Sequence, residues 1–275
     1  GHMPHVLSMT ATPIPRSLAL TLYGELDISL ITTKPADRKP IKTEIIPFAA
    51  RDKLYREIDS ELAEGRQAFV VCPLITDSDY LPGKSAEQVY DELSKKYFKH
   101  RRIGLLHGRL KAAEKDTIMQ AFLRHELDLL VTTTVIEVGV DVPNATVMVI
   151  ENAERFGLAQ IHQLRGRVGR SDQQGYCYLL LGDNQAPSRR LLAVKQSSDG
   201  FKLAEYDLEL RGPGAIYGTM QHGQLDLRVA KLTDAKLIAT ARGRAQEFID
   251  KGENLLKYKE LYERVKLNRS VTNLN

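Results

Sequence analysis

The chain has 275 residues, of which 43% are hydrophobic and 27% are charged, and its formal net charge is +4. This length suits one large domain or two small ones, and this composition is typical of a globular protein rather than a disordered one. No apolar run approaches the roughly 20 residues that span a bilayer. No basic and then apolar leader is present either, so we expect a cytoplasmic protein without a membrane partner.

The two cysteines, Cys72 and Cys177, each lie inside an apolar run. We interpret them as buried strand thiols, and a disulfide between them is the less favoured alternative. The histidines show no metal-ligand spacing, so we expect no metal site formed by this chain.

The positive charge is concentrated near the C-terminus. Residues 226–275 contain 11 Lys and Arg against 7 Asp and Glu, whereas the two kinds balance before residue 226. A solvated helical face is the favoured interpretation, and contact with a polyanion is the alternative.

The first 40 residues do not form a domain of their own. Residues 1–3 are typical of a tag remnant. Residues 4–33 suggest a strand end, a turn, a helix to about Tyr23 and a strand over Glu25–Ile31, too little to bury a core. We expect the tail of a missing domain, followed by a proline-bracketed linker at 34–40.

After the linker, predicted strands and helices alternate through residues 41–185. We expect strands over Ile41–Pro47, Ala68–Leu74, Ile103–Leu106, Leu127–Thr133, Thr146–Ile150 and Tyr176–Leu181. We expect helices over Leu54–Glu64, Ala86–Phe98, Ala112–Leu123 and Ala159–Gly166. This alternation predicts an α/β fold, a parallel sheet with helices on both faces, in which ligands gather at the carboxyl ends of the strands.

Beyond this region the strand signal stops. Two short helices are predicted over Pro187–Ser198 and Asp199–Leu210, and a glycine-rich loop at 211–223 follows. Thr233–Lys251 and Asn254–Val265 are predicted amphipathic helices. The C-terminal part is therefore expected to be mainly helical.

Two patterns resemble nucleotide-binding motifs without meeting their requirements. Gly83-Lys84-Ser85 has Ser78 where a P-loop needs a glycine to curl its amides around phosphates. Asp91-Glu92 lies within a predicted helix, whereas the acidic box of a nucleic-acid motor closes an apolar strand. We interpret both as ordinary surface segments.

The segment that indicates chemistry is Gln160–Arg170 (QIHQLRGRVGR). Arg165, Arg167 and Arg170 alternate with glycines, and buried arginines without partners would be costly. Arginine forks match phosphate oxygens and stabilise a phosphoryl group in transfer. Arg167 and Arg170 would face the same way on a helical turn. A basic protein-contact surface is the less favoured alternative.

Two loops that follow predicted strands suit contacts with nucleic acid or nucleotide. The hydroxyls of Thr132–Thr134 could hold a phosphate backbone, and His107-Gly108 follows the strand before it. Gly139 permits close approach, and Asp141 is suited to accept a ribose hydroxyl or to orient an arginine.

Taken in order, these motifs resemble those of superfamily 2 helicases. The series runs from Thr10-Ala11-Thr12-Pro13 through LLHGRL and VTTTVIEVGVDVP to QLRGRVGR, which matches the family's arginine-finger motif. The later segment DGFKLAEYDLELRGPGAIYGTMQHG resembles the translocation motif of the RecG family. The transcription-repair coupling factor shares a relative of that motif and is the alternative. Ala215-Ile216-Tyr217 and Met220 depart from the family pattern.

The resemblance implies a fold, a division of the chain and a set of roles. Residues 4–33 would end a missing first RecA-like lobe, 41–185 would form the second lobe, 186–225 a translocation motif of helical hairpin plus loop, and 226–275 a basic helical extension. It assigns catalytic residues Arg167, Arg170 and Gln163, and ATP-binding residues Gly139, Asp141 and Gly166. It assigns DNA contacts to His107, Gly108, Thr132, Thr133 and Thr134, and translocation to Arg211, Gly212 and Gln221.

The implied function is that of an ATP-dependent translocase on double-stranded DNA, which remodels stalled replication forks and Holliday junctions. ATP with Mg²⁺ would be bound with metal ligands from the missing lobe, and the partners would be branched DNA, that lobe and a fork-binding domain. Because no P-loop is present, we expect this chain alone to be inactive. A non-enzymatic RecA-like module that binds DNA or protein is a further alternative.

Overall fold

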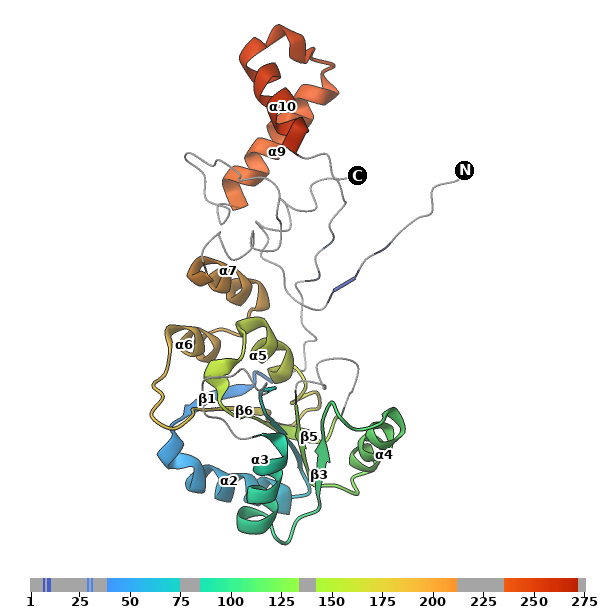
Figure 1. Ribbon diagram of the computed structural model, residues 1–275, viewed down its shortest axis with the longest axis vertical. Helices are drawn as coiled ribbons and strands as arrows, with labels where there is room; N and C mark the ends of the chain where they lie inside the picture. The colour runs from blue at the N-terminus through green and yellow to red at the C-terminus, as the bar shows by residue number, and fades with distance from the viewer. Residues whose placement is uncertain are drawn as a thin grey trace. The chain divides into compact units, whose positions relative to one another are not determined.

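In the computed structural model, residues 39–74, 85–133, 142–211 and 235–271 are described, together with Leu7, Met9, Thr10, Ser29 and Ile31. From residue 39 onward, the described chain divides into two compact units between Leu203 and Ala204. Each unit is considered by itself. The first contains the sheet, and the second contains the C-terminal helices (Figure 1).

The described strands and helices follow the predicted order. They are β1 (Lys42–Ile46), η1 (Phe48–Ala50), α2 (Arg51–Ala63), β2 (Gln67–Val71), α3 (Ala86–Glu92), η2 (Leu93–Tyr97), β3 (Ile103–Leu106), α4 (Ala112–Leu123), β4 (Leu129–Thr132), β5 (Ala145–Ile150), η4 (Ala153–Arg155), α5 (Leu158–Arg165), β6 (Tyr176–Leu180), α6 (Arg189–Gln196), α7 (Gly200–Arg211), α9 (Ala235–Asp250), η5 (Leu255–Lys257) and α10 (Lys259–Val271). The predicted helix over Ala86–Phe98 is present, as the α-helix α3 followed by the π-helical turn η2. The short turns η1 and η4 were not predicted. The elements expected within residues 4–33 lie outside the described residues.

The six strands form one parallel sheet, in the order β1-β6-β5-β2-β4-β3. Every residue of β2, β4 and β5 is buried, whereas the edge strands β1 and β3 alternate in exposure. Central strands of a parallel sheet are buried in this way because crossover helices cover both faces. The prediction of a parallel α/β sheet is confirmed.

Two layers of helices enclose the sheet (Figure 1). α2 and α3 cover one face, where Tyr55 and Leu93 join a core with Val70 and Val131. α4, α5 and α6 cover the other face, where the Phe122 ring packs against Phe69 with centroids 4.9 Å apart. Burying each such side chain contributes about 1.5–3 kcal/mol to stability.

Both cysteines lie inside this core as free thiols, which confirms the prediction for them. Burial raises the pKa of the Cys177 thiol to about 12 and that of Cys72 well above its usual value. Neither thiol is therefore suited to act as a nucleophile at neutral pH.

The helices of the second unit lie largely in contact with solvent. Among the described side chains of residues 236–266, each is exposed or half-buried. The rings of Phe248 and Tyr258 pack edge to face at 5.4 Å, which joins α9 to the turn before α10. No helix among the described residues is long and apolar enough to span a membrane.

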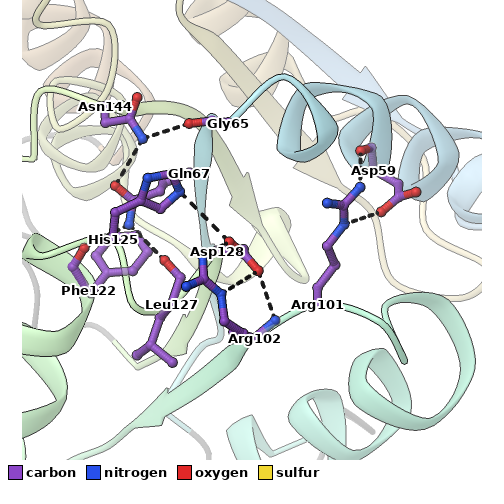
Figure 2. Close-up of polar contacts among 10 residues, drawn as sticks. All are labelled: Asp59, Gly65, Gln67, Arg101, Arg102, Phe122, His125, Leu127, Asp128 and Asn144. Atoms are coloured by element: carbon purple, nitrogen blue, oxygen red, sulfur yellow. Dashed lines mark hydrogen bonds and ion pairs between the residues drawn. The ribbon is translucent and has the colours of Figure 1, made fainter.

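Polar side chains fasten the loops at the amino-terminal edge of the sheet (Figure 2). The Gln67 side-chain amide donates to the carbonyls of Phe122 and Leu127, at 2.7 and 2.8 Å. Asn144 donates to the carbonyl of Gly65 at 2.9 Å and to the Gln67 side chain. These bonds satisfy a buried amide where β2 begins.

Asp128 anchors a neighbouring part of the same edge. Its carboxylate accepts from the backbone N–H of Arg102 at 2.9 Å and from the Arg102 guanidinium at 2.6 Å. Burial alone raises the pKa of Asp128, but the hydrogen bonds and charge of Arg102 outweigh it, so the pKa is lowered.

This lowered pKa predicts a loss of stability in acid. The stabilisation is present above the unfolded-state aspartate pKa of roughly 3.9, and it is lost as the pH falls through the lower folded-state value. The free energy of unfolding, measured by urea titration between about pH 6 and pH 2.5, should decrease toward acid, and Asp128→Asn should flatten part of that decrease. An identical pH slope in wild type and variant would contradict this role for Asp128.

Candidate functional site

The arginine-rich segment begins at the C-terminal end of α5. The helix ends at Arg165, and tight turns continue it, with the N–H of Arg167 donating to Leu164 O at 2.9 Å. Gly169 has a φ of +63°, which a residue with a side chain rarely adopts. Arg167 and Arg170 therefore do not share a regular helical turn, and the expectation that they do is wrong because α5 ends before them.

Arg165 differs from the other two arginines because it is buried. Its guanidinium donates to Val194 O at 2.8 Å and to Ser197 O at 2.9 Å, and it contacts His162 Nδ1. It thereby caps the C-terminal end of α6, where free carbonyls attract a cation. Burial lowers the pKa of this guanidinium. The prediction that groups Arg165 with phosphate chemistry is corrected, since its role here is to join α5 to α6.

Arg167 and Arg170 remain accessible. Arg167 is half-buried and Arg170 is exposed, while Val168 between them is buried. Arg170 Nε donates to Gly166 O at 3.1 Å, which turns this side chain back toward the end of α5. Gln163 is half-buried on α5, and Gly166 forms the C-terminal cap. Two such guanidinium groups suit the oxygens of a phosphate chain.

These arginines do not lie at the carboxyl ends of the strands. Gly169 N donates to the carbonyl of Ala145, where β5 begins, and Gly169 packs against Gly175, just before β6. The arginine segment thus reaches the amino-terminal edge of the sheet. The segment therefore does not lie with the loops at the carboxyl ends of the strands, because α5 runs back along the sheet before the segment starts.

The predicted DNA-contacting residues do lie at the carboxyl-terminal edge. Leu106 in β3 pairs with Thr132 in β4, so the residues that follow, His107 and Thr133, emerge side by side. Among the described residues, His107 Nδ1 and Thr133 Oγ1 are buried without a hydrogen-bond partner. Buried polar atoms seldom stay unpaired, so these two are suited to meet a ligand.

The other residues of this edge differ in access. Gly108 is exposed, with open space where a Cβ would stand. Thr132 is fully buried, and its hydroxyl donates to Thr133 O at 2.8 Å, so it lies behind the edge rather than on it.

An acidic side chain lies beside this edge. Glu87, in the first turn of α3, has a carboxylate oxygen 3.9 Å from His107 Nε2. A backbone hydrogen bond at the helix start and the Ser85 hydroxyl hold the pKa of Glu87 below its usual value, and His107 and Arg109 lower it further. Ser85 itself caps α3, with Gln88 completing a capping box.

The predicted residues of the translocation element and of the loop after β4 are mostly outside the described part of the chain. Arg211 is placed as the last residue of α7. Thr134, Gly139, Asp141, Gly212 and Gln221 lie outside the described residues. Lys84 and Gly83 lie outside them as well, whereas Asp91 is on the exposed face of α3 and pairs with Lys95 at 2.8 Å, as expected of a surface helix.

One buried ionic cluster was not predicted. Glu151, directly after β5, pairs with Arg51 at 2.6 Å and accepts from the Tyr55 hydroxyl at 2.7 Å. Burial raises the pKa of Tyr55 well above its usual value, and the Glu151 charge raises it further. The sequence offered one signal for this cluster, a single glutamate directly after the apolar run ATVMVI. Its partners could not be predicted, because they are about 100 residues away in the sequence.

No metal site was found in the part of the chain that the structure describes, which contains no group of three or more His, Cys, Asp or Glu residues that could hold an ion. The chemistry of the arginine segment is cationic. It suits an anion such as a phosphate chain rather than a divalent cation.

Comparison with known proteins identifies the chain. Residues 49–172 match the helicase conserved C-terminal domain, and residues 197–274 match domain 3, C-terminal, of ATP-dependent DNA helicase RecG. An ATP-dependent DNA helicase RecG of Synechocystis is 50% identical over 263 residues, 95% of this chain and 32% of that protein. The protein of that name from Thermotoga maritima is 50% identical over 93% of this chain and 33% of its own length. The chain belongs to the RecG family of DNA helicases.

Solved structures agree with this assignment. A structure described as RecG bound to a three-way DNA junction is 48% identical, with a TM-score of 0.64, over 83% of this chain and 30% of that one. The RecA-like fold of the helicase C-terminal domain, with helices following it, is thus confirmed. The chain spans about a third of the length of its curated RecG relatives.

Proposed function

We propose that this chain forms the C-terminal helicase lobe and following translocation region of an ATP-dependent translocase on double-stranded DNA, which remodels stalled replication forks and Holliday junctions in the bacterial cytoplasm. Its partners are branched DNA, the first helicase lobe and a fork-binding domain of the same protein. The observation that carries the proposal is the accessible pair Arg167 and Arg170 beyond the end of α5, within a chain 48% identical to a RecG described as bound to a three-way junction.

The arginines act on the phosphates of ATP. Arg167 and Arg170 neutralise charge that develops on the transferred phosphoryl group, while Gln163 and Gly166 hold the end of α5 close to the nucleotide. Gly139 and Asp141 are proposed to contribute to the same nucleotide site. Mg²⁺ accompanies the nucleotide, and its protein ligands belong to the first lobe.

The carboxyl-terminal edge binds the DNA backbone. The unpaired Thr133 Oγ1 and His107 Nδ1 donate to or accept from backbone groups, and exposed Gly108 lets the backbone approach. Thr132 supports Thr133 from behind, and Thr134 extends the same loop. Nucleotide and DNA therefore bind at opposite edges of one sheet, so closure of the two helicase lobes on ATP can move the DNA-binding edge as a rigid body.

The first prediction from the proposed function concerns this chain by itself. It should show no ATP turnover above a blank without enzyme, with or without forked DNA, because Ser78 stands where a P-loop needs glycine and Asp91-Glu92 lies on a helix face. A phosphate-release assay checks this. Real turnover would mean that another segment, such as Gly83-Lys84-Ser85, binds phosphate.

The second prediction tests the arginine pair in the full-length helicase. Arg167→Ala should reduce DNA-stimulated kcat for ATP by about 10³-fold or more, since an arginine on the transferred phosphoryl group is worth about that much. Binding to a three-way junction should stay within about threefold of wild type, because the arginine lies away from the DNA edge.

A matched control uses an arginine of ordinary surface character. Arg124 is exposed and pairs with Glu126 at 2.7 Å, so Arg124→Ala should leave both ATP hydrolysis and junction binding unchanged. Near-wild-type hydrolysis in Arg167→Ala would contradict the catalytic role.

The third prediction separates ATP hydrolysis from translocation along DNA. Arg211, Gly212 and Gln221 form the translocation element, so Arg211→Ala in the full-length helicase should keep DNA-stimulated ATP hydrolysis within about twofold while junction unwinding falls more than about tenfold. Parallel assays of phosphate release and strand separation check this. An equal loss of both activities would show that Arg211 is structural.

A further inference from the structure

Two glycines touch backbone to backbone on either side of the Arg170 loop. A Cβ built on Gly175 would stand 2.9 Å from Gly169 Cα, and one built on Gly169 would stand 3.1 Å from Gly175 Cα. A Cβ on Gly175 would therefore force the backbone of Gly169 to move, and one on Gly169 would be both tightly crowded and strained by the positive φ of that residue. The loop at residues 169–175 therefore closes on itself at this contact.

The closed loop is fastened to the segment that leads into β1. The N–H of Lys42 donates to Gly175 O at 2.9 Å, and the Gln174 side-chain amide donates to Pro40 O at 2.8 Å. Ile41 Cγ1 lies 3.3 to 3.5 Å from the Cβ positions of both glycines. Pro40 is the last residue of the predicted linker at 34–40, so the loop is tied to the residues that lead directly into β1.

We propose that Gly175 and Gln174 are positioning residues for Arg170, and that their contacts with Pro40–Lys42 hold the backbone from which this arginine extends. This inference rests on the proposed function, in which Arg170 reaches the phosphates of ATP. Arg170 follows Gly169 directly, and the Gly169 N–H is also held by Ala145 O at 3.3 Å. The guanidinium thus extends from a backbone that is fixed at the starts of β1, β5 and β6.

The loop is built to hold a backbone position rather than to bind a ligand itself. Gly175 is buried, whereas Arg170 beside the contact is exposed. Gln173 adds a further tie by accepting from Arg66 at 2.7 Å, which joins the loop to the turn before β2. A rigid backbone beneath an exposed arginine is what precise contact with a phosphate requires, since a shift of about 1 Å in the position of a catalytic group can cost about 100-fold in rate.

The test uses Gly175→Ala and Gln174→Ala in the full-length helicase, assayed for ATP hydrolysis with three-way junction DNA. Gly175→Ala should lower kcat by about tenfold or more, while KM for ATP and junction affinity change by less than about threefold. Gln174→Ala, which removes the side-chain hydrogen bonds to Pro40 O and Gly175 O but adds no clash, should lower kcat by a smaller factor in the same direction. Gly243→Ala is the control, because nothing lies within 4 Å of a Cβ there, and it should behave as wild type.

A double-mutant cycle distinguishes positioning from general damage to the fold. In an Arg170→Ala background, Gly175→Ala should cause little further loss of kcat, because the side chain that it positions is gone. Full additivity of the two losses, or unchanged kcat in both single variants, would overturn the inference. Should Gly175→Ala fail to fold, Gln174→Ala and its cycle with Arg170→Ala decide the matter by the same criteria.

Failure of this inference can be told from failure of the proposed function. A wild-type helicase without DNA-stimulated ATP hydrolysis would refute the proposed function. An active wild type whose Gly175→Ala and Gln174→Ala variants equal it in kcat would refute the positioning role alone.

Discussion

The complete burial of the central parallel strands is the constraint on which the rest of the fold depends. β2, β4 and β5 offer no residue to solvent, since helices cover both faces. Polar chemistry is therefore confined to the two edges where the strands begin and end. The arginine segment reaches the start of β5, whereas His107 and Thr133 lie at the ends of β3 and β4 with Nδ1 and Oγ1 atoms that have no hydrogen-bond partner among the described residues.

Charges that enter the interior are paired with particular partners. Glu151 lies against Arg51 and the Tyr55 hydroxyl, and breaking such a pair by removing one partner costs about 3–5 kcal/mol. Arg165 has no carboxylate partner among the described residues. Its guanidinium instead donates to two backbone carbonyls at the C-terminal end of α6. These contacts fix helices α2 and α6 against the sheet, so the accessible arginines extend from a rigid body.

The sequence predicted the fold well because strand and helix periodicity is local. The strand Ile103–Leu106 and the helix Ala112–Leu123 were placed at their observed bounds, since an apolar run and a capped amphipathic run define them. Residue types alone also predicted phosphate-binding roles for Arg167 and Arg170, and the structure shows both to be accessible, while the roles themselves stay a prediction. The burial of Arg165 could not be foreseen, as its partners Val194 and Ser197 contribute only backbone carbonyls, which leave no trace in the sequence. The contact of Gly169 with Gly175 could not be predicted either, because it joins two backbones and a single glycine in a loop is common.

The central claim is that nucleotide and DNA bind at opposite edges of the sheet. A structure of the full-length helicase with a non-hydrolysable ATP analogue and a three-way junction tests it most directly. The account predicts phosphate oxygens within hydrogen-bond distance of the Arg167 and Arg170 guanidinium groups, and a DNA backbone against His107 and Thr133. Nucleotide found at the carboxyl-terminal edge, or DNA bound against the arginine segment, would contradict it.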